Sequence, residues 1–73
     1  MIYHIGNKYK FRYIKDVIIE NELFSLIANE NGNRHIISRI YLPDNLYYNT
    51  FFIAEITGKD CSGRLKIKFI SNL

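Results

Sequence analysis

Hydrophobic and polar residues alternate along most of this chain with a period of two, which is the period of β-strands that bury one face. The alternation is clearest in residues 64–70, where Leu65, Ile67 and Phe69 are expected to face inward and the basic residues between them outward. Similar runs, rich in β-branched and aromatic residues, occur elsewhere in the chain. The five strands that the pattern predicts are residues 8–19, 23–28, 34–38, 50–57 and 64–70.

The first predicted strand is long, and its pattern changes phase. Tyr9, Phe11 and Tyr13 share one face, but Asp16 breaks the alternation before the apolar residues 17–19. A β-bulge inserts one residue into a strand, which bends the strand and re-aims the side chains after it. We therefore expect a single strand that contains a bulge.

A β-hairpin is predicted in the middle of the chain, because the polar residues 29–33 include a glycine and separate two β-rich runs. Phe24 and His35 lie on opposite arms of this hairpin, with Arg34 next to His35. The pattern of the second strand does not decide which of its faces points inward.

The connection between the third and fourth strands, residues 39–49, is less periodic, and Pro43 marks a turn or the start of a short helix. We expect at most a short helix there, with Tyr41, Tyr47 and Tyr48 packed against the end of the strands. The chain has 73 residues, which is enough for one domain over residues 1–73. Five strands with one longer connection predict an all-β fold, a small five-stranded Greek-key barrel of the oligonucleotide/oligosaccharide-binding (OB) type.

Four short runs carry a more specific pattern. They are Phe24-Ser25-Leu26-Ile27, His35-Ile36-Ile37-Ser38, Phe52-Ile53-Ala54-Glu55-Ile56 and Gly63-Arg64-Leu65-Lys66-Ile67. Together they resemble the S-one RNA-binding domain, an OB-fold repeat, over residues 24–69. The resemblance implies a domain that binds single-stranded nucleic acid, RNA rather than DNA.

The resemblance also implies roles for individual residues. Phe24 and His35 would lie at the exposed ring positions of the second and third strands, where bases stack. Candidates for phosphate contacts around them are Arg34, Arg39, Lys66 and Lys68. The alternative is that Phe24 belongs to the core, that His35 is an ordinary surface histidine, and that the basic stripe of the fifth strand only faces water.

Charge and composition add little to this hypothesis. Ten Lys and Arg against seven Asp and Glu give a formal charge of +3, a weak preference for polyanions. The single Cys excludes an internal disulfide, so we expect a reducing, cytoplasmic location. No run is long and apolar enough to span a membrane.

Catalytic and cofactor motifs are not found in the sequence. The acids are scattered, no nucleophile has a recognisable base, and no Cys and His spacing suggests a metal site. We therefore expect no enzyme, no cofactor and no metal. A second hypothesis is a protein-interaction or self-associating module, because both faces of residues 50–57 are largely apolar and another subunit could cover one of them.

Overall fold

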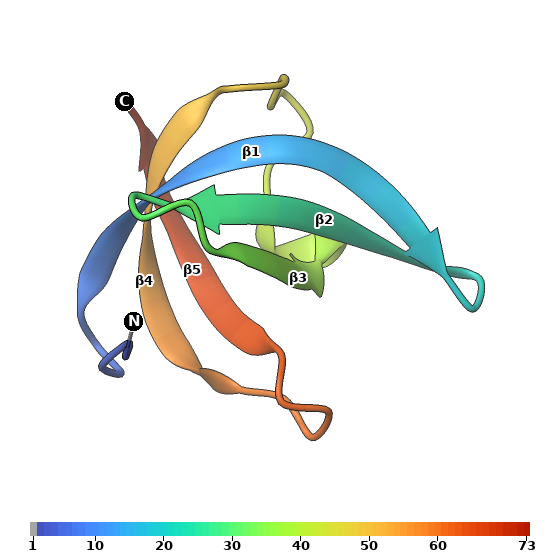
Figure 1. Ribbon diagram of the computed structural model, residues 1–73, viewed down its shortest axis with the longest axis horizontal. Coiled ribbons are helices and arrows are strands. Elements are labelled where there is room, and N and C mark those ends of the chain that lie inside the picture. The colour runs from blue at the N-terminus through green and yellow to red at the C-terminus, as the bar shows by residue number, and fades with distance from the viewer. Residues whose placement is uncertain (1) are drawn as a thin grey trace.

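The computed structural model describes residues 2–73, which fold into one antiparallel sheet and one short 3-10 helix (Figure 1). The elements are β1 (Lys8–Ile19), β2 (Glu22–Asn29), β3 (Arg34–Ser38), η1 (Arg39–Tyr41), β4 (Phe51–Lys59) and β5 (Leu65–Asn72). The five predicted strands and the all-β class are confirmed. The short helix in the long connection is η1, which follows β3 directly.

The strand order is β3-β2-β1-β4-β5, so β1 is central and β4 pairs with β1 rather than with β3. The sheet curls strongly (Figure 1), and this brings its two edge strands, β3 and β5, into contact. These edges are not hydrogen-bonded neighbours, so the sheet is not closed into the predicted barrel. β3 has only five residues before the chain turns into η1, which leaves a short edge for pairing.

The core lies on the concave side of the sheet, and the period of two explains most of it. Phe52 is fully buried, and its ring lies 5.9 Å from that of Phe11 and 5.6 Å from that of Phe69, which joins β1, β4 and β5. The core cluster consists of Phe11, Tyr13, Ile27, Ile37, Leu42, Leu46, Phe52, Ala54, Ile56, Leu65 and Ile67.

The predicted bulge in β1 is present. The register between β1 and β2 shifts between Tyr13 and Lys15, so that Asp16 lies opposite Ser25. The Asp16 carboxylate accepts hydrogen bonds from the hydroxyls of Tyr13 and Ser25, each at 2.7 Å. The bulge thus turns a charged side chain toward a polar site at the end of the core.

The tyrosines of the long connection differ from one another. Tyr41 packs partly against the core, as predicted, but Tyr47 and Tyr48 are exposed. They belong to a turn in which the Thr50 amide donates to the Tyr47 carbonyl at 2.9 Å and Asn49 has a φ of 67°. The prediction that they pack against the strands is wrong, because this turn directs both rings into solvent.

Candidate nucleic-acid interface

Phe24 and His35 do not form a shared stacking platform, because they lie on opposite faces of the β2–β3 hairpin. His35 pairs with Ile27 and Phe24 pairs with Ser38. Directly opposite residues share a face, and residues three apart on one strand do not. Ile27 belongs to the core, so His35 is on the core side and Phe24 on the outer side.

The Phe24 ring is on the outer face, yet only 7% of the residue is exposed. The guanidinium of Arg64, the residue before β5, lies over this ring with its central carbon 4.6 Å from the ring centroid. Such a cation–π contact holds the cation in place and covers the ring. Phe24 therefore positions Arg64 and does not offer a free ring to a base.

His35 is half-buried and bonded to the N-terminal segment. The hydroxyl of Tyr3 lies 2.7 Å from His35 Nε2 and accepts a hydrogen bond from Asn29 Nδ2 at 2.9 Å. The Tyr3 hydroxyl thus bridges Asn29 and His35, and one of Tyr3 and His35 donates to the other according to the tautomer of the histidine. The two rings meet edge to face with centroids 5.3 Å apart.

The pKa values fit this neutral pair. Burial lowers the pKa of His35 and raises the pKa of Tyr3, since both charged forms would lose water. His35 therefore contributes a ring surface near neutral pH rather than a positive charge.

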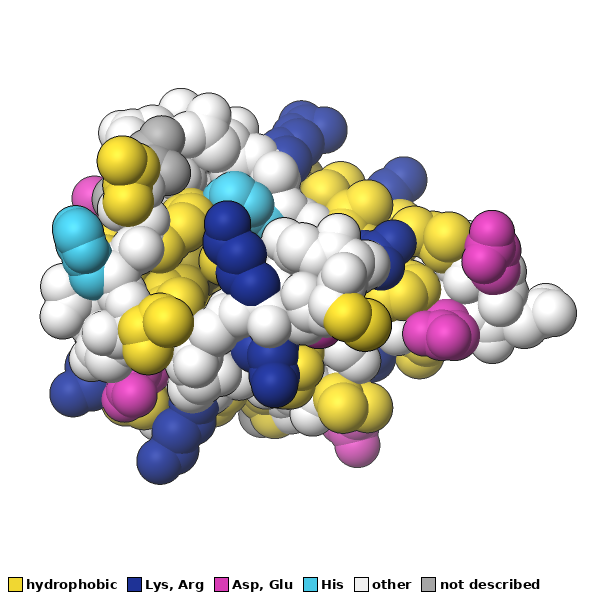
Figure 2. Space-filling model, turned by 90° about the horizontal axis from the view of Figure 1, so that it is seen from below, with side chains coloured by type: hydrophobic (Ala, Val, Ile, Leu, Met, Phe, Trp, Pro, Cys, Tyr) yellow, Lys and Arg dark blue, Asp and Glu magenta, His cyan; other side chains and the backbone are white. Residues whose placement is uncertain are grey.

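An open groove of about 420 Å³ lies where β3 faces the β4–β5 hairpin. Three cations reach it from different places in the fold: Arg34 from β3, Lys59 from the end of β4 and Arg64 from the turn just before β5. The remaining lining residues are Tyr3, His35, Ile36, Gly63 and Leu65, so no acidic side chain among residues 2–73 lines the groove. Figure 2 shows Lys and Arg side chains around a histidine near the middle of this side of the molecule.

The β4–β5 turn fixes the place of Arg64. Asp60 Oδ1 accepts hydrogen bonds from the amides of Ser62 and Arg64, each at 2.9 Å, and Gly63 closes the turn with a φ of 86°. The Arg64 side chain also donates to Ser62 Oγ at 2.9 Å. These bonds hold the arginine at the rim of the groove before any ligand arrives.

The other three phosphate candidates have different surroundings. Arg39 is bound to Asp16 at 3.1 Å and to the carbonyls of Leu42 and Pro43, so its guanidinium is engaged in contacts within the protein. Lys66 is exposed on the same face of β5 as Arg64 and extends the line of cations from the groove. Lys68 lies farther along β5, opposite the acidic Glu55.

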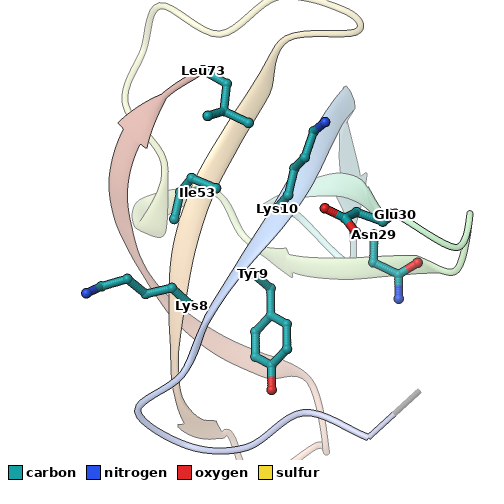
Figure 3. A pocket seen from close by; sticks show the side chains of 7 residues that line it. All are labelled: Lys8, Tyr9, Lys10, Asn29, Glu30, Ile53 and Leu73. Atoms are coloured by element: carbon teal, nitrogen blue, oxygen red, sulfur yellow. The ribbon is translucent and has the colours of Figure 1, made fainter.

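A second hollow adjoins β1 and β4, but its side chains do not converge. Figure 3 shows the amines of Lys8 and Lys10 pointing in different directions and the Tyr9 ring pointing away from both. Glu30 also lines this hollow, which weakens its attraction for an anion. We therefore place the candidate interface in the first groove, where β3 faces the β4–β5 hairpin.

Six of the eight residues that line the groove were not among the predicted site residues, and three of the six, Tyr3, Lys59 and Arg64, carry polar or charged groups into it. The sequence contained a pattern that could have identified Arg64, because this residue opens the fifth predicted strand within the Gly63-Arg64 run. No sequence pattern indicated Lys59 or Tyr3 as site residues. Lys59 is simply the last residue of a strand, and Tyr3 is 32 positions away from His35 in the sequence. Only the curl of the sheet brings them together.

No group of His, Cys, Asp or Glu that could hold a metal ion is found among residues 2–73, and no helix there is long and apolar enough to cross a membrane. No protein-family model, no curated protein and no solved structure matches this chain. Its function is therefore argued from its own geometry.

Proposed function

We propose that this chain is a non-catalytic domain that binds single-stranded nucleic acid, RNA rather than DNA, in the groove between β3 and the β4–β5 hairpin. The observation that carries the proposal is the convergence of Arg34, Lys59 and Arg64 on one acid-free groove. None of these three cations forms a salt bridge within residues 2–73. The acid beside Arg64 is Asp60, whose pKa is lowered by the hydrogen bond from Ser62 and, more weakly, by the charge of Arg64. A nucleic-acid backbone supplies the row of negative charges that such a groove attracts.

The proposal includes the finer fold, a partly open barrel of the OB type. The strand order, in which three consecutive strands are followed by a fourth beside the first, supports a Greek-key path. The edges β3 and β5 touch without pairing, as in a five-stranded, partly open barrel. The preference for RNA rests on the resemblance to the S-one family.

The roles of the residues follow from their positions. Arg34, Lys59 and Arg64 contact phosphates, and Lys66 continues that line along β5. The rings of Tyr3 and His35 form the wall on which a base can stack, a contact worth roughly 1 to 3 kcal/mol per base. Phe24 acts through Arg64, which its ring supports.

The test is fluorescence anisotropy with a labelled oligouridylate of about 12 nucleotides, a length typical of one OB domain. We expect Arg34→Gln and Arg64→Gln each to weaken binding about fivefold and to reduce the salt slope by about 0.7, because each removes one phosphate contact. An oligothymidylate of equal length measures the preference for RNA.

Lys15→Gln is the matched control, because Lys15 is exposed on β1 and does not line the groove. It removes the same charge and should change binding much less than the groove variants. Equal losses of affinity in all three variants would show that binding depends only on the net charge of the protein. No binding at about 50 mM salt would reject the proposal.

A further inference from the structure

An apolar surface lies uncovered at the end of the molecule formed by the β1–β2 hairpin and η1. Ile18, Leu23 and Ile40 are 74%, 49% and 84% exposed. Ile18 lies directly opposite Leu23 in the β1–β2 ladder, and Leu23 shares a hollow with Ile40. We call these three residues the isoleucine end.

The isoleucine end continues the core beyond the part of the sheet that the chain itself covers. Leu23 lies on the same face of β2 as Ser25 and Ile27, which are fully buried. Figure 1 shows the β1–β2 hairpin projecting past the other strands, so nothing in residues 2–73 covers its tip. Adjacent exposed apolar side chains with a polar rim mark interaction surfaces.

The rim of the isoleucine end is acidic. Glu22 and Asp44 line its hollow, and Glu20 stands at the hairpin turn. Arg39, the cation that lines the hollow within residues 2–73, is bound to Asp16 at 3.1 Å and lies 3.8 Å from Asp44. Figure 2 shows acidic side chains gathered at the right, the side of the β1–β2 turn in Figure 1. A partner must therefore bring apolar side chains together with positive charge.

The chain itself has such a surface at its other end. Ile2 and Ile5 are 81% and 74% exposed beside an apolar hollow that Ile56 and Leu65 also line. Lys59 is the charged residue of that hollow within residues 2–73, and because it also lines the nucleic-acid groove, a second copy and nucleic acid compete for it. We call this surface the lysine end. Figure 1 shows the N-terminal residues and the β1–β2 turn on opposite sides of the molecule.

We propose that this protein self-associates head to tail, with the isoleucine end of one copy seated on the lysine end of a second copy. Each contact buries isoleucines from both copies and places Glu22 and Asp44 near Lys59 of the second copy. Because the two surfaces differ, each contact leaves one free end on either copy, so assembly continues unless a ring closes.

Sedimentation velocity of the full chain, without nucleic acid, tests the proposal from about 10 µM to about 1 mM, where weak interfaces form. We expect the mass to rise above the 8.7 kDa of one chain, and to rise less at higher salt. Ile40→Ser and Ile5→Ser, both at exposed positions outside the core, should each lower the association constant at least about tenfold.

Mixing the two variants distinguishes head-to-tail contact from other arrangements. Ile40→Ser keeps an intact lysine end and Ile5→Ser keeps an intact isoleucine end, so the mixture should form a dimer and stop there. Association that Ile40→Ser abolishes but Ile5→Ser leaves unchanged would indicate a symmetric contact and overturn the proposal. A wild-type mass that stays at 8.7 kDa up to about 1 mM would also overturn it.

The acidic rim has its own matched pair of variants. Glu22→Lys should weaken association, because it places a lysine against Lys59 of the second copy. Glu30→Lys makes the same change of net charge at an exposed loop position that lines neither hollow and should leave the association constant unchanged.

Discussion

At the scale of single residues, the hydrogen-bond partners of Asp16 determine its role in the fold. Its carboxylate accepts hydrogen bonds from Tyr13, Ser25 and Arg39. Burial alone would raise the pKa of Asp16, but these bonds and the charge of Arg39 outweigh burial and lower it. Burial and the bond to Asp16 raise the pKa of Tyr13 to about 12. Arg39, a predicted phosphate contact, is thereby part of the fold.

The lowered pKa of Asp16 gives a pH prediction with a definite sign. The unfolded chain binds this proton more tightly, so the stabilisation is present above the unfolded pKa of about 3.9 and is lost as pH falls through the folded value. Asp16→Asn should lower the free energy of unfolding at pH 7 by about 1 kcal/mol, since Asp16 is partly exposed. Urea unfolding between about pH 2 and pH 7 measures both effects.

In Asp16→Asn, the loss of stability with acid should be smaller than in the wild type. Glu30→Gln, at an exposed loop position, is the control and should keep the wild-type pH dependence. An acid dependence that Asp16→Asn leaves unchanged would show that the Tyr13, Ser25 and Arg39 cluster does not tune this carboxyl.

At the scale of elements, the β2–β3 turn depends on one buried amide. Asn29 Oδ1 accepts hydrogen bonds from the backbone amides of Asn31 and Asn33, each at 2.9 Å, and Asn29 Nδ2 donates to the Tyr3 hydroxyl. A side chain that bonds the backbone two residues ahead stabilises a turn. Asn29 thus links the hairpin to the segment that carries Tyr3.

Asn29→Ala should lower the free energy of unfolding by about 1 to 3 kcal/mol, because it removes the three hydrogen bonds that this buried side chain makes to Asn31, Asn33 and Tyr3. Chemical unfolding followed by circular dichroism measures the loss. Asn33→Ala is the matched control in the same loop and should change stability by less than about 0.5 kcal/mol, because it keeps the backbone amide that Asn29 binds. Equal losses in both variants would contradict the role given to Asn29.

At the scale of the whole molecule, the fold depends on a small core that several strands share. Phe52 is 0% exposed and its ring lies between those of Phe11 and Phe69, whereas its neighbour Phe51 is 43% exposed beneath Lys10. The two residues are adjacent in sequence and face opposite sides of β4. They offer a direct test of which face holds the sheet together.

Phe52→Ala should lower the free energy of unfolding by about 3 to 5 kcal/mol, a large part of the stability of a domain this small. Phe51→Ala removes the same atoms from the outer face and should cost less than about 1 kcal/mol, since the ring is already partly in water. Thermal unfolding of the two variants compares them, and similar melting temperatures would contradict the assignment of faces.

The sequence by itself determined the strands of this protein. The spacing of apolar residues that are close together in the sequence shows whether a strand buries one face. It predicted the five strands and the bulge in β1, and it allowed at most a short helix between β3 and β4, but it marked Pro43 as a possible helix start, whereas η1 ends at Tyr41. It also named Arg34, His35 and Lys66, which lie in or beside the groove.

Only the tertiary structure decided which side chains meet. The register of the β2–β3 hairpin put Phe24 and His35 on opposite faces, and the curl of the sheet placed Arg64 over Phe24 and brought Tyr3 to His35. It also left β3 and β5 unpaired. Contacts between residues far apart in the chain depend on strand register, curl and the bulge, and no local pattern of residues encodes those three together.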